Sequence, residues 1–489
     1  MNNSLVNAMV KENNYTNTEN GALTYKSTTN YLLDWFGLGA ALRMRTEADK
    51  ICLFSKAFAE DKLSALKVLF YIRDIRGGQG ERSTFRTCLK WLANNYPNIV
   101  VKNMENIPFY GRWDDLFVLD GTSVEREMYE YYGKSLISDF LSMKMGNSIS
   151  LCAKWAKSEN TSCSESRRLA HKLRKSMVGF SSKDYRKLLK KLRSYSNVVE
   201  AQMCSKQWDQ IDFGKVPSKA SLLYKKAFNK HESERYGRYL NAVANGEAKM
   251  NAGAVYPYEI LRSILNCGDE TSIKSADLQW KNQPNWLENN PHYGLVVADV
   301  SGSMTCNNSL PLLVSISLAI YFAERNVGPF TNKFLTFTDN STLQEVIGNN
   351  LKEKYENLSR ADWAGSTNIQ SAFEQILQAA VKHNVPKSEM PSVLYIISDM
   401  EFNSCCEGTN YESMKQKFIN CGYDLPKVVF WNVNARNNQS PITVDDSGTC
   451  LVSGCSPSIL KSVLSGKDFS PLSVLLETIN SDRYNKVVV

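Results

Sequence analysis

The sequence predicts a multidomain protein in which an N-terminal, all-α helical-repeat region is joined to a C-terminal, doubly wound α/β domain. The chain has 489 residues, more than the roughly 250 to 300 at which a single hydrophobic core usually divides. Its apolar residues recur at helical spacing from Tyr31 to about Cys267, but after Asn289 short apolar runs alternate with helical segments. A composition of 43% hydrophobic and 22% charged residues is that of a packed globular protein.

The N-terminal segment, residues 1–28, is rich in Asn and Thr and has neither a basic start nor an apolar core. It predicts a disordered or poorly ordered tail and no signal peptide. The longest mostly apolar run, residues 310–323, is shorter than the ~20 residues that a membrane-spanning helix needs, so we expect no such helix. Most of the 12 cysteines are widely spaced in apolar stretches and predict buried, reduced thiols, as in a cytoplasmic protein.

Residues 29–289 predict the helical-repeat region. In the stretch 181–201, Tyr185, Leu188 and Leu192 share one helix face, and most of the lysines and arginines line the other. A capping box in the sequence TSVE, residues 122–125, predicts the start of another helix. Successive helices over such a length predict a solenoid-like arrangement, although the sequence shows no strict repeat period.

Residues 290–489 predict the α/β domain. The run GLVVADV, residues 294–300, is continuously apolar, as in a strand that is buried on both faces of a parallel sheet. Because strand and helix alternate, we expect a doubly wound sheet, in which ligands usually bind just beyond the carboxyl ends of the strands. Further strands are expected at 333–339, 342–348, 392–399, 427–435 and 449–454.

Five oxygen-bearing side chains fall in loops at that edge of the predicted sheet. They follow the first strand as D-x-S-x-S, precede a later helix and end the strand SVLYIISD, and they are Asp299, Ser301, Ser303, Thr367 and Asp399. Carboxylate and hydroxyl oxygens are hard ligands that suit Mg²⁺ with some retained waters. Each motif alone also fits a structural role, since Asp, Ser and Thr at such positions commonly cap helices or turns. Together they predict one divalent cation site with an open position for an acidic group of a partner.

The stretch DVSGSM resembles the signature of the von Willebrand factor A domain, and the resemblance covers residues 290 to about 485. It implies a metal-ion-dependent adhesion site at which some of the ligands bind through water. The ion would be Mg²⁺, or Mn²⁺ or Ca²⁺ in its place. The implied ligands are Asp299, Ser301 and Ser303 from the first loop, Thr367 from the second and Asp399 from the third.

The helical half resembles a largely uncharacterised family of plants, fungi and large DNA viruses, in which a helical region precedes a von Willebrand A domain. More distantly, the arrangement is similar to the Ro autoantigen ribonucleoproteins, whose helical TROVE domain closes into a ring on a von Willebrand A domain. That similarity implies the architecture and, as partners, small structured or misfolded RNAs, without assigning individual RNA-contacting residues. The segments that carry the resemblance include NYLLDWFGLGAALR, FYIRDIRGGQGERSTFRTCLKWLANNYP, NIPFYGRWDDLF and AVYPYEILRSIL.

One basic block dominates the charge pattern. Residues 151–250 carry 22 Lys+Arg against 9 Asp+Glu, although the net charge of the whole chain is only +8. Tyrosines and Trp208 are interleaved with these cations, a pattern that allows both phosphate pairing and base stacking. A lysine-rich helix face is nonetheless often simply solvated, and these tyrosines fall at core spacing. The candidate RNA-binding residues are Lys172, Arg174, Lys175, Arg186, Lys187, Lys190, Lys191 and Arg193.

The motifs do not predict an enzyme. The turn RDIRGGQGERS lacks the final Gly-Lys-Ser/Thr and the preceding strand of a phosphate-binding loop, and DVSGSM is not a nucleophile elbow. Two functions therefore remain open. The protein is either an RNA-binding scaffold whose metal site engages a partner, or a Mg²⁺-dependent protein-assembly module that binds no RNA, and neither function involves a membrane.

Overall fold

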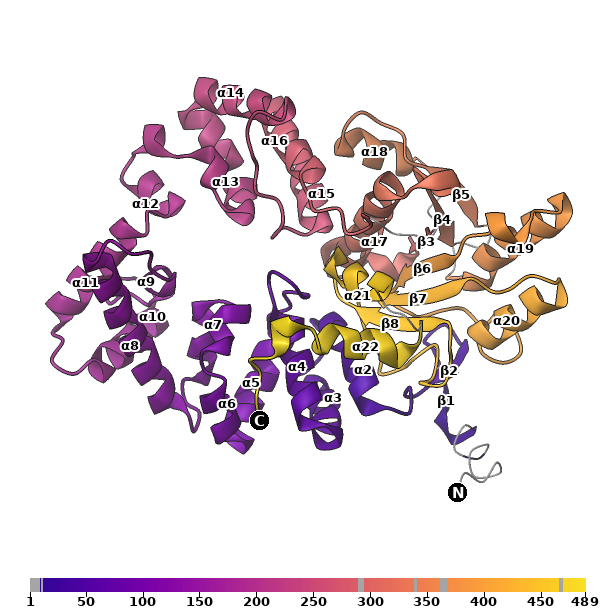
Figure 1. Ribbon diagram of the computed structural model, residues 1–489, viewed down its shortest axis with the longest axis horizontal. Coiled ribbons are helices and arrows are strands. Elements are labelled where there is room, and N and C mark those ends of the chain that lie inside the picture. The colour runs from indigo at the N-terminus through magenta and orange to yellow at the C-terminus, as the bar shows by residue number, and fades with distance from the viewer. Residues whose placement is uncertain (1–8, 10–11, 289–293, 338–340, 361–366, 466–468) are drawn as a thin grey trace.

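The structure is a computed structural model that describes residues 9, 12–288, 294–337, 341–360, 367–465 and 469–489. Helices make up its N-terminal part, and a six-stranded sheet with helices packed around it makes up its C-terminal part (Figure 1). The predicted division into an all-α part and an α/β part is therefore confirmed.

The helical part consists of short helices joined by short turns. Several begin at side-chain caps: Thr46, Ser181 and Asp269 each accept a hydrogen bond from a backbone N–H in the first turn of the following helix. The α-helices are α2 (Tyr31–Leu38), α3 (Glu47–Glu60), α4 (Lys62–Arg73), α5 (Ser83–Asn95), α6 (Pro97–Lys102), α7 (Asn106–Tyr110), α8 (Glu125–Lys144), α9 (Cys152–Trp155), α10 (Ser164–Ser176), α11 (Ser182–Tyr195), α12 (Val199–Cys204), α13 (Ser218–His231), α14 (Ser233–Ala244), α15 (Pro257–Leu265) and α16 (Glu270–Lys281).

The start of α8 differs from the predicted capping box. The helix begins at Glu125, but Val124 is its N-cap and has no side-chain capping bond. The hydroxyl of Thr122 instead donates to the carbonyl of Leu119 at 2.6 Å, and the carboxylate of Glu125 accepts from the backbone N–H of Gly121 at 2.5 Å. Both side chains therefore bond to the turn that precedes α8.

The sheet of the C-terminal part has the strand order β5-β4-β3-β6-β7-β8. All neighbouring strands are parallel except for β5, which runs antiparallel to β4 at one edge. β3 lies between β4 and β6, and Val297 pairs with Leu335 on one side and with Ile396 on the other. The strands are β3 (Gly294–Asp299), β4 (Lys333–Phe337), β5 (Thr342–Glu345), β6 (Val393–Ser398), β7 (Lys427–Asn432) and β8 (Thr449–Ser453).

The helices of this part are α17 (Cys306–Arg325), α18 (Leu351–Leu358), α19 (Ile369–His383), α20 (Asn410–Asn420), α21 (Leu460–Ser465) and α22 (Pro471–Ile479). Within the described residues, one helix, Gly302–Arg325, is long and apolar enough to cross a membrane by length and composition. The apolar run of residues 310–323 lies inside this longer helix. Its most apolar window is 67% buried within the protein, and α17 packs against β3, β4 and β6. A place in the protein core accounts for the apolar composition of α17.

The predicted poorly ordered N-terminus is wrong for residues 12–28. Strands β1 (Tyr15–Asn17) and β2 (Leu23–Tyr25) form an antiparallel hairpin that docks on the C-terminal part. The hydroxyl of Thr18 donates to the carbonyl of Phe402 at 2.6 Å, and the backbone N–H of Tyr25 donates to the carbonyl of Ser440 at 3.0 Å. The polar composition predicted disorder because these partners lie almost 400 positions away in the chain.

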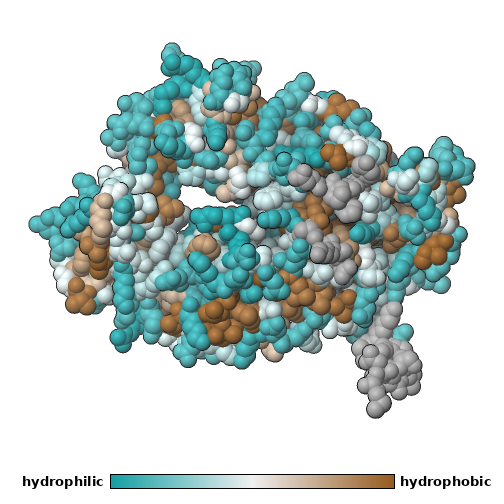
Figure 2. All heavy atoms as spheres, in the orientation of Figure 1, coloured by the Kyte–Doolittle hydropathy of each residue, from teal (hydrophilic) through white to brown (hydrophobic). Residues whose placement is uncertain are grey.

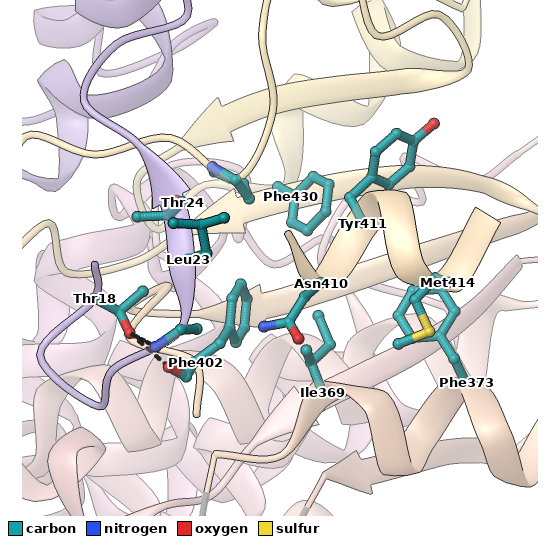
Figure 3. A pocket seen from close by; sticks show the side chains of 12 residues that line it. Thr18, Leu23, Thr24, Ile369, Phe373, Phe402, Asn410, Tyr411, Met414 and Phe430 are labelled. Carbon is teal, nitrogen blue, oxygen red and sulfur yellow. Dashed lines mark hydrogen bonds between the residues drawn. The ribbon is translucent and has the colours of Figure 1, made fainter. Parts of the chain in front are cut away.

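The hairpin covers the gap between α19 and α20 (Figure 3). Leu23 faces apolar side chains of the C-terminal part that include Phe402, Tyr411 and Phe430. The cavity that remains measures about 10 Å³, too small for a ligand. The N-terminal hairpin is therefore a structural piece of the C-terminal part.

The helical part leaves the sheet and returns to it, so the molecule has the form of a ring (Figure 1). At one end α2 packs against β8 and α22, and at the other end α15 packs against α17. The loop at residues 74–82 joins the two ends, because Gln79 accepts from the hydroxyl of Tyr256 and from the backbone N–H of Ser456, both at 3.0 Å. Figure 2 shows a narrow opening between the two arms of the ring.

No disulfide bond joins any of the 12 cysteines, all of which lie in the described residues. The prediction of buried thiols holds for only five of them: Cys88, Cys152, Cys267, Cys450 and Cys455. Another five, including Cys52 and Cys163, are exposed because they lie on the solvent side of their helices or in turns, where apolar neighbours in sequence do not imply burial.

Candidate metal centre

The two carboxylates of the predicted site meet at the carboxyl edge of the sheet. Asp299 is the last residue of β3, and Asp399 directly follows β6. Because β3 and β6 are parallel neighbours in register, their ends lie side by side. The two side chains are buried, with 0% of Asp299 and 1% of Asp399 exposed. The next strand in sequence, β4, lies on one side of β3, and β6 lies on the other. In open α/β sheets, ligands bind at the carboxyl edge where the strand order reverses in this way.

The loop after β3 arranges its polar atoms around Asp299. The backbone N–H of Ser301 donates to Oδ1 of Asp299 at 2.9 Å, and the hydroxyl of Ser398 donates to Oδ2 at 2.6 Å. The hydroxyl oxygens of Ser301 and Ser303 are 3.0 Å apart. The first loop therefore brings one carboxylate and two hydroxyls together, as the spacing D-x-S-x-S predicts.

One oxygen of Asp399 accepts no hydrogen bond from a described residue. Its Oδ1 accepts from the backbone N–H of Glu401 at 3.2 Å. Its Oδ2 is buried without a hydrogen-bond partner among the described residues, and the nearest cation is Nη1 of Arg436 at 3.8 Å. Unpaired buried carboxylate oxygens are rare because each has lost its water without compensation.

Burial raises the pKa of both carboxyl groups. The pKa of Asp399 rises to about 6, first because the group is buried and then because of the negative charge of Asp299. The pKa of Asp299 also rises through burial, although the hydrogen bonds from Ser398 and Ser301 oppose the shift. Two buried carboxylates that repel each other are stabilised by a cation placed between them.

Thr367 is buried and lies two residues before α19. Its carbonyl accepts from the backbone N–H of Asn403 at 2.9 Å, which ties this loop to the one that follows Asp399. The alternative role of Thr367 as a helix cap does not apply, because Asn368 is the N-cap of α19 and accepts from Ser371. The preceding residues of the motif WAGSTN, 363–366, lie outside the described residues.

The donor set fits a hard divalent cation. It holds the carboxylates of Asp299 and Asp399 and the hydroxyls of Ser301 and Ser303, and the Oδ2 of Asp399, which accepts no hydrogen bond from a described residue, supplies a position for an ion. Thr367 is placed only by its carbonyl, which ties its loop to the loop after Asp399. The described residues contain no cluster of three or more His, Cys, Asp or Glu side chains suited to a metal. The set thus favours Mg²⁺, Mn²⁺ or Ca²⁺ over zinc, which prefers nitrogen and sulfur ligands.

Two residues near the site were not singled out from the sequence. Ser398 orients Asp299, and Arg436 lies beside Asp399. Ser398 directly precedes Asp399 at the end of β6. As a polar residue at the end of an apolar run, it could have been recognised from the sequence as a site residue. Arg436 follows the neighbouring strand β7, and only the strand order brings it to this edge.

Three of the predicted RNA-binding residues are engaged within the protein. Lys172 pairs with Asp120 at 3.0 Å, and Arg174 pairs with Glu159 at 2.9 Å. Arg193 donates to carbonyl groups of α9 and of the residue after it, at 2.8 to 2.9 Å. These three side chains hold helices together and have few donors left for phosphates.

The other five predicted residues are exposed cations of α10 and α11, and together they are called the exposed basic face below. None of them makes an ion pair with a described carboxylate, and they are Lys175, Arg186, Lys187, Lys190 and Lys191. The apolar side of α11 is buried as its periodicity predicts. Tyr185 lies on that side and donates to the carbonyl of Lys157 at 2.6 Å, so its ring is not available to stack on a base.

The fold and the site together define a protein in which a helical arc closes on an α/β part that gathers carboxylates and hydroxyls at one sheet edge. A family model described as "Domain of unknown function (DUF2828)" matches residues 18–119 and 132–290, and one described as "Domain of unknown function (DUF7788)" matches residues 294–485. The uncharacterized protein L728 of Acanthamoeba polyphaga mimivirus is 33% identical over 515 residues, covering 96% of this chain and 88% of the relative. The chain belongs to the DUF2828 family.

This relative confirms the predicted resemblance to a family of large DNA viruses. Neither matching description names a von Willebrand A domain, so that assignment stays a prediction. Among solved structures, a crystal structure of the Ro (RSR) protein of Deinococcus radiodurans is similar at 14% identity and a TM-score of 0.37, covering 89% of this chain and 99% of that chain.

Proposed function

We propose that the protein is a non-enzymatic scaffold that docks an acidic group of a partner through a divalent cation, in the manner of a von Willebrand A adhesion site. The observation that carries the proposal is the buried pair Asp299 and Asp399, in which one carboxylate oxygen has no hydrogen-bond partner among the described residues. A buried carboxylate oxygen that accepts no hydrogen bond lowers stability, so its position next to two serine hydroxyls favours a ligand-binding role over a structural one.

The carboxylates and the hydroxyls would have different roles in binding the ion. Asp299 and Asp399 would supply negative charge to the ion, and the hydroxyls of Ser301, Ser303 and Thr367 would supply neutral oxygens. Mg²⁺ keeps some of its waters in such sites, and one of these positions can be taken by a carboxylate of a partner. A partner bound in this way would be released by chelation of the ion.

Replacement of Asp299 tests the metal site. We expect Asp299→Asn to weaken Mn²⁺ or Mg²⁺ binding by about a hundredfold or more, since the variant loses a charged ligand but keeps its size. Affinity is measured by calorimetry and by Mn²⁺ electron paramagnetic resonance. Asp212→Asn, which changes an exposed acid of the helical part, is the matched control and should bind as the wild type does. Equal affinity in both variants would contradict the proposed site.

A second function, RNA binding by the helical part, is favoured by the exposed basic face of α10 and α11. Its five cations lack carboxylate partners among the described residues, so their charge is available to phosphates. This face would bind the RNA backbone mainly by charge and shape, because Tyr185 of α11 is buried and the exposed Tyr195 donates its hydroxyl to the carbonyl of Asn147.

Charge reversal tests this second function. The triple variant Lys187→Glu, Lys190→Glu, Lys191→Glu should lose most RNA binding at low salt, and wild-type affinity should fall steeply as salt rises. Three exposed lysines elsewhere, Lys90, Lys382 and Lys415, give a charge-matched triple Glu control that should retain binding. Binding is measured by filter retention or fluorescence anisotropy with and without EDTA. RNA binding that persists in the first triple variant excludes this face as the RNA site.

A further inference from the structure

A second candidate site lies in the helical part, away from the sheet edge. Helices α13 and α15 both pack against α16, and a pocket of about 450 Å³ opens between them. This volume falls within the roughly 300 to 1,000 Å³ of pockets that bind small molecules. The residues whose charges and rings matter here are Lys219, Lys225, Lys226, Tyr258, Glu259 and Arg262.

The lining of the pocket is strongly basic. It contains four cationic side chains and one carboxylate, that of Glu259. Glu259 is already paired, because it accepts from the ammonium group of Lys219. The charges of Lys225, Lys226 and Arg262 therefore have no counter-charge in the pocket lining.

Lys225 and one guanidinium nitrogen of the half-buried Arg262 are buried without an acidic partner among the described residues. Lys225 is 3% exposed, and its ammonium group donates to the hydroxyl of Ser263 and forms no ion pair with a described carboxylate. Nη2 of Arg262 is buried and has no hydrogen-bond partner among the described residues. Burial also lowers the pKa of Lys225, although Cys267 and the charge of Asp269 oppose the shift. Buried charges in proteins are normally paired, so these two indicate a ligand.

The chemistry of the pocket identifies the class of ligand. The orphan donors of a guanidinium and an ammonium group suit the several acceptor oxygens of a phosphate, and arginine binds phosphate with two parallel hydrogen bonds. Three positive charges in one pocket, none of them in an ion pair with a described carboxylate, match a terminal phosphate or a pyrophosphate, which carries two or more negative charges. A nucleic-acid backbone carries only one charge per phosphate.

We propose that the pocket between α13 and α15 binds the pyrophosphate group of a small, nucleotide-sized ligand, with Lys225, Lys226 and Arg262 as its anion-binding residues. This site is independent of the divalent cation site and of the exposed basic face on α10 and α11. Tyr258 lies on the same wall, with its ring centroid 5.7 Å from the guanidinium carbon of Arg262, and would limit how that side chain can move.

Inorganic pyrophosphate, without added metal, is the probe that tests the proposal. Calorimetry on the full chain should show saturable binding, with affinity reduced about tenfold or more in Arg262→Met and in Lys226→Met. Lys230→Met is the matched control, because Lys230 is exposed one turn further along α13 and does not line the pocket. Because Lys226 is exposed, its replacement should not disturb folding. The Lys226 variant therefore still tests the site if Arg262→Met fails to fold.

Thermal stability separates a binding role from a structural one. Arg262→Met removes a buried donor that has no hydrogen-bond partner among the described residues, so the melting temperature of the ligand-free variant should be no lower than that of the wild type. A large drop in melting temperature would assign Arg262 a structural role and overturn its part in the site.

A nucleoside diphosphate and a single-stranded oligonucleotide complete the experiment. Binding of the diphosphate with the same sensitivity to both variants supports the proposal. The proposal is overturned if pyrophosphate does not bind, or if it binds equally to the wild type and to the Arg262 and Lys226 variants. A third outcome also overturns it: the oligonucleotide binds, the Arg262 and Lys226 variants weaken that binding, and neither pyrophosphate nor the diphosphate binds. The pocket would then recognise a nucleic-acid backbone.

Discussion

At the scale of single residues, Arg436 partly neutralises the negative charge that the sheet edge offers to a cation. Its guanidinium pairs with Glu19 from the N-terminal hairpin, and its Nη1 is 3.8 Å from Oδ2 of Asp399. A positive charge in that position competes with a divalent ion for the same carboxylate. Glu19 holds the arginine partly away from Asp399, so the hairpin takes part in setting the charge of the site.

Removal of the Arg436 charge should therefore strengthen metal binding. We expect Arg436→Gln to raise the Mn²⁺ affinity about three- to tenfold, a modest effect because the side chain is 36% exposed and screened by solvent. Glu19→Gln should have the opposite effect, since the released arginine can move closer to Asp399. Competition titration with a metal-sensitive dye gives both constants. Arg126→Gln, 85% exposed on α8, controls for the loss of one positive charge, and equal affinities in all variants would contradict this role.

At the scale of elements, the loop at residues 74–82 is shaped by its glycines. A Cβ on Gly78 would lie 2.0 Å from the backbone carbonyl oxygen of Tyr71, and one on Gly80 would lie 1.9 Å from the hydroxyl of Tyr256. Gly80 also has a φ of +62°, which other residues adopt at a cost. Gly78 therefore allows the loop to pack closely on the end of α4, and Gly80 allows it to approach Tyr256 at the start of α15.

Gly78→Ala should destabilise the protein by about 2 kcal/mol or more, because backbone atoms cannot move aside as a flexible side chain can. Chemical denaturation monitored by circular dichroism measures the change in the free energy of unfolding. Gly237→Ala is the contrasting variant: its Cβ would meet nothing within 4 Å inside α14, and alanine favours helix. If both variants had the same stability as the wild type, the close approach inferred for the loop would be wrong.

The elements also show what the sequence can and cannot predict. Continuous apolar runs located β3 and β6, and the position of Asp299 and Asp399 at their ends followed from the parallel arrangement. Long-range pairing was not visible: the hairpin of residues 15–25 finds its partners in the loop near Phe402. Only part of the basic block is an unpaired, exposed charged surface. The acids that neutralise Lys172 lie about 50 positions away in the chain, so the sequence did not show this pairing. Local patterns thus predict elements and their ends, whereas charge compensation depends on tertiary structure.

At the scale of the whole molecule, a buried carboxylate connects the C-terminus to the helical part. Asp74 has 0% exposure and accepts from Nη2 of Arg483 at 2.6 Å and from the hydroxyl of Tyr484 at 3.1 Å. It also accepts from the backbone N–H groups of Arg76 and Gly77, at 2.9 and 3.1 Å. One side chain therefore shapes the loop at 74–82 and anchors the last helical turn of the chain.

Asp74→Ala should lower the free energy of unfolding by about 3 kcal/mol or more, because it leaves the buried hydroxyl and guanidinium donors without their acceptor. Hydrogen exchange should show that α4 and the segment Asp482–Tyr484 lose protection together. Asp424→Ala removes an acid that is 90% exposed and is the control. Loss of protection confined to the C-terminal segment would show that the two regions are not linked through Asp74.

Because the helical arc returns to the sheet, noncovalent contacts should hold the two parts together even without the peptide that connects them. The N-terminal hairpin, α2, α4 and α15 all rest on segments that lie beyond residue 293 in the chain. Separate fragments ending and beginning near residue 290 should therefore associate into a noncovalent complex with the shape of the intact ring. Such a split protein would allow isotope labelling of one half alone.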